Sequence, residues 1–543
     1  MAMKRYIALV PVLLAATIGI SQTANDTINR MVLVESTYNP IIVGAVKRNF
    51  IPEEVKPSMN KEKVMYADDK VNLTNFQREA QPAQAITVNP EKGTRGYAHL
   101  GYGNYNNLSG LAAYKIRFKG SSELAFNGHI NGWNGKYKLP DNNKWHSHLY
   151  DMGLDANYGL SLGQVALNAG VSAAHYRYNY LSSSAPVQRS NDFAVHVGAK
   201  GSAYEHYYYQ ATIGYTYFDR STHFDQETLH SESHTHIDAS LSRDLYDWGM
   251  VSVGLNSDVL TYHGQEAYAN YFSLGITPRW DYRLGDFLFV SGFNLDFLGG
   301  NSNRPTQTPL QMSPECSISY VPSKIFSAKL ALDGGRDIHT FKSLYALSPY
   351  WASEQQIAPS YTFMNAHLEG NVRIIEGLHL RLGGGYKIVS DALFETAMDS
   401  LGITYTGLTN HKAQVATADA GISYTYKDLV SVSTEGTYYH WMLKDNQQLL
   451  ARAPQLDANI EARVRIIPNL YAHTDVRVVM FTQTEVASRE RTIIDWSLGA
   501  HYALNKRFSF FLDGHNLLGR RQCYYAGYPV QGFNVLAGAM VKF

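Results

Sequence analysis

Apolar and polar residues alternate along most of this chain. In the clearest run, from Leu456 to Ile466, every second residue is apolar and the five residues between them are polar or charged. Successive side chains of a β-strand point to opposite faces, so this run predicts a strand with one apolar and one charged face. A length of about 11 residues is enough for a tilted strand to cross a bilayer. The same alternation recurs in Phe326–Asp333 and Leu470–Val478.

The connections between such runs alternate in length. Tight turns are predicted at Ser161–Gly163, Leu284–Asp286, Pro322–Lys324, Glu376–Gly377, Tyr426–Asp428, Pro468–Asn469 and Asn505–Lys506. Longer polar loops are predicted at Asn134–Trp145, Asp219–Glu232, Gly300–Leu310, Ile338–Pro359, Ser390–His411 and Gln483–Thr492. Short periplasmic turns that alternate with longer external loops are typical of outer-membrane barrels.

Counting these runs gives the fold class. About 22 of them lie between Thr94 and Phe543, and an even number of strands returns both chain ends to the periplasm. Unpaired backbone groups at a sheet edge find no water in hydrocarbon, so a sheet in a membrane must close. The sequence therefore predicts an all-β protein: a transmembrane antiparallel β-barrel of about 22 strands with a short N-terminal periplasmic segment.

The first residues have the features of an export signal. Lys4 and Arg5 precede an apolar stretch that is too short to remain as a transmembrane helix. Small residues at Gly19 and Ser21 fit cleavage before Gln22. We expect residues 1–21 to be a signal peptide, 22–93 a proline-containing periplasmic segment, and 94–543 the barrel in the cell outer membrane of a Gram-negative bacterium.

The last run predicts a closing strand with an aromatic terminus. Its shared apolar face carries Phe533, Val535, Val541 and Phe543. A terminal aromatic residue in register with such a face resembles the signal that the barrel-insertion machinery reads. We therefore expect that machinery and outer-membrane lipid as partners.

Three stretches resemble a known family. The closing stretch "DGHNLLGRRQCYYAGYPVQGFNVLAGAMVKF" and the opening stretch "TRGYAHLGYGNYNNLSGLAAYKIRF" are similar to the barrel of TonB-dependent receptors, particularly those of the Bacteroidetes lineage. The segment "YNPIIVGAVKRNFIPE", with Tyr38, Pro40, Ala45, Lys47 and Pro52, resembles a periplasmic motif of barrel proteins in that group. The resemblance implies uptake of a solute across the outer membrane.

The chain departs from that family before the barrel. Between Gln22 and Gly93 it is too short for the globular plug that fills the lumen of such receptors, and it has no TonB-contact motif. A barrel of about 22 strands is normally plugged. We expect the N-terminal segment, inward-folded loops or a periplasmic or surface lipoprotein to obstruct the lumen. The segment 22–93 is expected to run along the periplasmic mouth without forming a globular domain.

Composition excludes one class of partner. The chain has 47 Lys+Arg and 47 Asp+Glu, so it has no basic excess to neutralise phosphates, and we expect no nucleic acid. Its 39 Tyr and 43 Gly suit membrane strands, because the tyrosine ring is apolar and its tip is polar. The same composition also fits a secreted β-sandwich or a sugar-binding β-protein.

Two patterns resemble chemical sites. His230, His234 and His236 share one strand face and are weak candidates for metal ligands, since imidazole binds zinc, copper and nickel. Water-facing residues of a polar lumen would look the same, and we expect no cofactor. The GxSxG match at Gly159–Gly163 falls at a tight turn, whereas a nucleophile elbow needs a following helix. We therefore expect no catalytic residue and no enzyme.

Two functions remain open. The first is uptake or transport of a solute across the outer membrane, as the barrel resemblance implies. The second is a non-transporting barrel, a structural or accessory subunit of an outer-membrane protein assembly, which the missing plug favours. The solute is not encoded in any motif we recognise.

Overall fold

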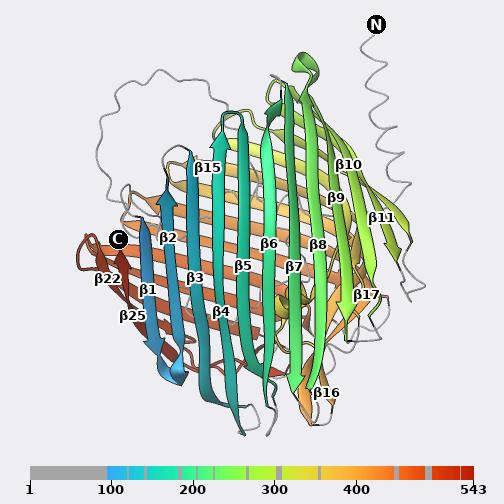
Figure 1. Ribbon diagram of the computed structural model, residues 1–543. Coiled ribbons are helices and arrows are strands. Elements are labelled where there is room, and N and C mark those ends of the chain that lie inside the picture. Colours follow the sequence, from blue (N-terminus) through green and yellow to red (C-terminus); the bar gives the residue numbers. More distant parts are fainter. Residues whose placement is uncertain are drawn as a thin grey trace.

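The chain forms a closed ring of antiparallel strands (Figure 1). The computed structural model describes residues 95–543 except for 119–120, 140–142, 182–185, 204–205, 224–226, 265–267, 301–307, 353–355, 401, 445–449, 451, 483–491 and 526. The last strand of the ring, β25 (Asn534–Lys542), pairs with the first, β1 (Gly96–Gly103), and so leaves no edge. The ring has 22 strand positions, which confirms the predicted fold class.

Each strand pairs with its neighbours in chain order. The others are β2 (Leu108–Arg117), β3 (Ser122–Lys138), β4 (Lys144–Leu162), β5 (Val165–Asn179), β6 (Val187–Ala203), β7 (Tyr207–His223), β8 (Glu227–Asp244), β9 (Met250–His263), β10 (Tyr271–Leu284), β11 (Phe287–Gly300), β12 (Leu310–Pro314), β13 (Cys316–Tyr320), β14 (Phe326–Asp337), β15 (Ser360–Ile375), β16 (Leu378–Ser400), β17 (Ile403–Tyr426), β18 (Val430–Met442), β19 (Pro454–Ile467), β20 (Leu470–Phe481), β21 (Thr492–Ala503) and β22 (Phe508–His515). β12 and β13 share one position, because both pair with β11.

Small elements lie outside this ring or between its strands. They are the 3-10 helices η1 (Asn104–Asn106) and η2 (Tyr246–Trp248), the helix α4 (Phe341–Leu347) and the two-stranded hairpin β23 (Cys523–Tyr525) and β24 (Tyr528–Pro529). Among the described residues, no helix is long and apolar enough to cross a membrane.

The two faces of the wall differ as the alternation predicts. Large apolar side chains point outward and are more than half exposed, among them Leu154, Val197, Leu241, Leu368 and Leu512. Polar and charged side chains such as Lys329, Asp333 and Glu369 take the inward face. An outward apolar face suits contact with lipid, because hydrocarbon surrounds a membrane barrel. The wall is therefore that of an outer-membrane barrel.

The closing seam contains the predicted assembly residues. The Phe543 amide donates to the Gly96 carbonyl at 2.9 Å, and the Phe543 ring stacks on Tyr114 with centroids 5.8 Å apart. Val541 pairs with Ala98 across the seam, and the Phe533 carbonyl accepts a hydrogen bond from the Asn104 side chain. The terminal aromatic residue thus lies where the ring closes. Its part in insertion remains a prediction.

The two ends of the ring differ in their connections. At one end the connections run from 163–164 at the shortest to 245–249 and 321–325 at the longest, and all seven predicted tight turns lie there. At the other end they include 338–359 and 516–533. We refer to this second end as the external end, because outer-membrane barrels have their longer loops outside. It is the lower end in Figure 1, where the arrow of β1 points.

Three predicted loops are wrong. The regions Asn134–Trp145, Asp219–Glu232 and Ser390–His411 were expected as loops, but most of their described residues continue the strands β3, β4, β7, β8, β16 and β17. These strands extend beyond a membrane-spanning length, where water or other loops replace lipid. The outward face there has no need to be apolar, so the alternation that reveals a strand is lost.

Candidate functional site

The external end of the ring is closed by its own chain. The described part of the connection 338–359, namely 338–352 and 356–359, is called the closing segment. It folds inward from β14 and contains α4. Thr340 caps this helix, because its side-chain oxygen accepts a hydrogen bond from the Ser343 amide at 3.1 Å. Phe341 at the start of the helix packs against Phe218 of β7, Tyr262 of β9 and Tyr268. The closing segment is therefore held against the inner wall.

Buried aromatic rings fill the space around the closing segment. We call this group the mouth cluster: Trp133, Tyr137, Trp145, Tyr178, Tyr180, Phe218, Tyr268, Phe341, Leu344, Tyr345, Leu347, Tyr350, Trp351, Ile357, Leu393, Leu408, Tyr525 and Tyr528. Its members come from both sides of the ring, and Trp351 is completely buried. Burial raises the pKa of Tyr345, Tyr350 and Tyr528 above that of an ordinary phenol. These three side chains stay neutral, so the cluster is held by packing and neutral hydrogen bonds.

Hydrogen bonds join the closing segment to the far wall. Thr406 of β17 donates its amide to the Tyr350 carbonyl at 2.8 Å, and its carbonyl accepts from the Ala352 amide at 2.9 Å. The Ser348 hydroxyl donates to the Thr406 hydroxyl at 2.9 Å. The segment thus leaves β14, contacts β8 and β9 through Phe341, and reaches β17 through Tyr350 and Ala352.

Opposite walls also meet directly. Leu181, just after β5, forms a bridge with Thr404 of β17, whose amide donates to the Leu181 carbonyl at 3.2 Å. β5 and β17 lie half a ring apart in strand order. A second connection, 516–533, adds the hairpin β23–β24. Its Tyr528 stacks on Tyr350 with centroids 3.6 Å apart and bonds to both Leu181 and Thr404.

Two buried ionisable groups hold the closing segment, and burial raises the pKa of Glu232 to about 8. Both carboxylate oxygens of Glu232, on β8, accept from the Phe341 amide at 2.9 and 3.0 Å. Arg220, on β7, is fully buried, and its guanidinium lies 4.7 Å from the ring centre of Trp351. It donates to the Tyr180 hydroxyl and, at 3.4 Å, to the Pro349 carbonyl. Within the described residues no carboxylate pairs with Arg220, and its Nε and Nη1 atoms have no acceptor.

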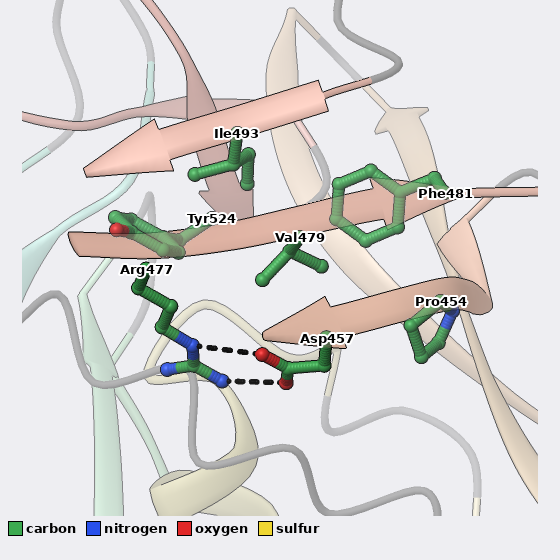
Figure 2. Close-up of a pocket in the computed structure, with 7 residues that line it drawn as sticks. All are labelled: Pro454, Asp457, Arg477, Val479, Phe481, Ile493 and Tyr524. Atoms are coloured by element: carbon green, nitrogen blue, oxygen red, sulfur yellow. Dashed lines mark hydrogen bonds and ion pairs between the residues drawn. The ribbon is translucent and has the colours of Figure 1, made fainter. Parts of the chain in front are cut away.

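The inner wall beside the mouth has a different character. Figure 2 shows Arg477 of β20 facing Asp457 of β19, with which it forms an ion pair at 2.9 Å, and Tyr524 next to Arg477. Imidazole and carboxylate groups pair in the same way, as in His367 with Asp419 at 2.9 Å. The inner wall is thus a surface of paired charges.

The predicted metal candidates separate into two places. His234 and His236 converge on Asp258 of β9, at 2.8 and 2.7 Å. His230 lies outside this group. It pairs across the sheet with Arg220 and belongs to the mouth. The sequence shows no sign of Asp258, because only the register of β8 and β9 brings it opposite His236.

The structure describes one other predicted site, the GxSxG match, whereas the N-terminal predictions fall on residues outside the described range. The GxSxG match ends β4 and continues into the turn at Gly163, whose φ is +59°, and a strand follows it. This is the expected turn between strands. The periplasmic motif with Tyr38, Pro40, Lys47 and Pro52, the signal peptide and the segment 22–93 all lie outside the described residues.

Sequence reasoning placed Glu232 on the same strand face as His230, His234 and His236, but it missed Arg220. A charged residue on an inward face is ordinary in a barrel, and Arg220 fits the alternation of its strand. The available signal was the aromatic content of 338–359, with Phe341, Tyr345, Tyr350 and Trp351 in one connection. An exposed loop has little reason to carry so many large rings.

Comparison with known proteins supports the fold. No family model matches the chain, and no curated protein matches it in sequence. Similar solved structures include the copper transporter OprC, with a TM-score of 0.63 and 13% identity over 84% of this chain and 82% of that chain. The FrpB iron transporter from Neisseria meningitidis (F5-1 variant) has a TM-score of 0.65 and 12% identity over 82% of each chain.

A third similar structure is the ferric-catecholate import receptor Fiu from K12 E. coli. Its TM-score is 0.60 and its identity 10%, over 84% of this chain and 83% of that chain. These neighbours are TonB-dependent receptors with a 22-strand barrel. At such identities the likeness concerns the fold, which this chain shares with them.

Proposed function

We propose that this protein is a gated outer-membrane barrel for solute uptake, and that the closing segment is its external gate. The observation that carries this proposal is the buried guanidinium of Arg220 and the buried carboxyl group of Glu232 at the two points where the closing segment is held. The similar solved structures include proteins named as a copper transporter, an iron transporter and an import receptor, which favours uptake over other uses of the fold.

Buried ionisable groups favour a closing segment that can leave the mouth. Arg220 and Glu232 lose their hydration when the segment closes, and Arg220 gains only partial hydrogen bonding in return. An unsatisfied buried donor costs about 1–3 kcal/mol, more if it is charged. The two residues are diagonal neighbours, because Arg220 pairs with His230 and Glu232 with Phe218. Diagonal neighbours are within reach of long side chains. Once the segment leaves, water reaches both groups and the pKa of Glu232 falls toward its ordinary value. Its carboxylate can then pair with Arg220.

The second function is a structural or accessory barrel in an outer-membrane assembly. A permanently closed mouth would favour it, and the experiment below separates the two. We further propose that the chain is of the Bacteroidetes type, that Gln22–Gly93 lies along the periplasmic mouth without forming a full plug, and that a lipoprotein partner and the insertion machinery bind the barrel. The segment "YNPIIVGAVKRNFIPE" supports the first of these.

The test measures opening of the purified barrel in planar bilayers. A reference variant without native cysteines carries Ser348→Cys and Thr406→Cys, whose hydroxyl oxygens are 2.9 Å apart, so that oxidation locks the segment to β17. Arg220→Met keeps a long side chain but removes the buried charge. This change removes the desolvation cost of Arg220 from the closed state. A cost of about 1.4 kcal/mol corresponds to a factor of ten, so the opening frequency should fall about tenfold or more, toward that of the locked barrel.

Reduction of the disulfide should restore opening in the reference variant. A barrel whose conductance is the same in the oxidised and reduced states would contradict the gate and favour the structural function. More frequent opening in Arg220→Met would show that Arg220 holds the gate shut instead of favouring its release.

A further inference from the structure

We propose that His234, His236 and Asp258 form an exchangeable binding site for a divalent transition-metal ion on the inner wall. The inference goes beyond the proposed gate, because it concerns a site in the wall and requires no movement of the closing segment. His234 and His236 lie on β8, and Asp258 lies on the paired strand β9. Side chains of the opposite parity, such as Ile237 and Val259, are exposed on the outer face, so the three candidate ligands point inward.

The three ligand atoms already lie together. One carboxylate oxygen of Asp258 is 2.8 Å from His234 Nε2 and 2.7 Å from His236 Nδ1. All three atoms are within 4.8 Å of one another. Ligands of tetrahedral zinc at about 2.0–2.2 Å from the ion are about 3.4 Å apart. Each of the two contacts must open by about 0.6 Å, which small side-chain rotations provide.

This convergence differs from the other pairs in the wall. His129 with Asp151, His367 with Asp419 and His473 with Asp513 each bring a single imidazole to a carboxylate. Across the described part of 95–543, only the β8–β9 group has three potential ligands within binding distance. One imidazole on a carboxylate is a common hydrogen bond. Two imidazoles on one carboxylate form a donor set that zinc, copper and nickel accept.

The surroundings leave room for an ion and for exchange. Gly214 of β7 lies opposite His236 and has no side chain, and a Cβ there would meet its nearest heavy atom, the Val195 carbonyl oxygen, at 3.7 Å. The Asp258 side chain is only 7% exposed, whereas that of His236 is 35% exposed. Three protein ligands leave a fourth position for water or another ligand, which is typical of exchangeable or catalytic sites and not of closed structural ones.

The site also lies next to the gate along the same strand. Glu232, which holds Phe341 of the closing segment, precedes His234 by two residues on the same face of β8. An ion bound by His234 and His236 would therefore be near the first surface that a solute meets after the mouth opens. This position suits an ion that is itself transported, or a bound ion that holds a transported solute. Either ion would be bound by the same three ligands.

The experiment measures metal binding to the purified full-length barrel. Zn²⁺, Cu²⁺ and Ni²⁺ are titrated separately by calorimetry, and Co²⁺ is followed by its visible absorption. The wild type should bind one ion. His234→Ala/His236→Ala should weaken binding by more than about 100-fold, because changes outside the ligand shell alone cost about 10–100-fold. Asp258→Asn, which removes the charge but keeps the shape, should also weaken it.

The matched control is His367→Ala, which removes an imidazole from an equivalent wall pair and should leave the affinity unchanged. Retained heat-modifiable gel mobility shows that each variant is folded. Affinity should fall as the pH falls, because protons compete for the imidazole nitrogens. A wild type without a stoichiometric ion, or equal binding by wild type and the double variant, would overturn the site. Either result would leave the gate experiment unaffected.

Discussion

The external mouth and the wall below it are built from different interactions. The mouth cluster joins rings from β3, β4, β5, β7, the closing segment and the hairpin β23–β24, which are far apart in the chain. The wall joins neighbouring strands through pairs such as Asp457 with Arg477, which lie on the same hairpin. The mouth is dry and aromatic, whereas the inner wall is polar.

The difference shows which part of the barrel can change shape. The backbones of the wall pairs are fixed by the hydrogen-bond ladder of adjacent strands, so these strands separate only if the barrel unfolds. The mouth depends on packing between a loop and several strands. Arg220 and Glu232 are buried there, and each binds the closing segment separately. A loop can leave while the ring stays intact. We therefore expect opening to take place at the mouth.

Removing a central ring should have the largest effect on opening. Trp351 is completely buried between Phe341 and Arg220. Trp351→Ala should destabilise the closed arrangement by about 3–5 kcal/mol, as large-to-small changes in a packed core do. Cells that carry this variant should become sensitive to vancomycin, which is too large to cross an intact outer membrane.

The matched control is Trp248→Ala at the opposite end of the ring. Trp248 is 75% exposed in η2, so its removal leaves no cavity. Equal vancomycin sensitivity for the two variants would contradict a closed mouth, since only Trp351 lies in the mouth cluster.

Changes to ion pairs of the wall should have the smallest effect on stability and on passage through the barrel. Asp457→Asn/Arg477→Gln replaces the ion pair of Figure 2 by neutral groups of similar shape. A cross-strand pair contributes up to about 1 kcal/mol, so the free energy of unfolding in urea should change by no more than about that amount. Vancomycin sensitivity should stay at the wild-type level. A large rise would show that the wall, and not only the mouth, controls passage.

The sequence predicted the wall well and the mouth poorly, for a physical reason. A strand in a membrane has lipid on one side and a polar lumen on the other, so Leu456–Ile466 records its two faces in every second residue. Beyond the membrane this contrast ends. Ala392, Leu393, Phe394 and Glu395 of β16 are consecutively buried, because loops cover both sides of the strand there. The predicted loop at Ser390–His411 was wrong for this reason.

Contacts between segments that are distant in the chain do not appear in the alternation of apolar and polar residues. His234 and His236 were predicted to share a face, since they are two residues apart on one strand. Asp258 was missed because its position depends on the register between β8 and β9. Arg220, and the contact of Glu232 with Phe341, were missed because both residues bind the closing segment, and nothing in the alternation shows where a loop will fold.

The most direct test of a closed external mouth is to label, in intact cells, a cysteine that faces the lumen of the barrel. In a chain with both native cysteines replaced by Ser, Ser172→Cys introduces a thiol on the inward face of β5. This position is four residues before Tyr176, which packs against Tyr345 of the mouth cluster. Ser400→Cys, on the exposed tip of β16, serves as the external control. The reagent is a bulky maleimide that does not cross membranes.

Ser400→Cys should react in every background. Ser172→Cys should stay unreactive while the closing segment is present and should react once 341–351 is replaced by a Gly–Ser linker. If Ser172→Cys reacts equally with and without the closing segment, the external mouth is open and our account of this barrel is wrong.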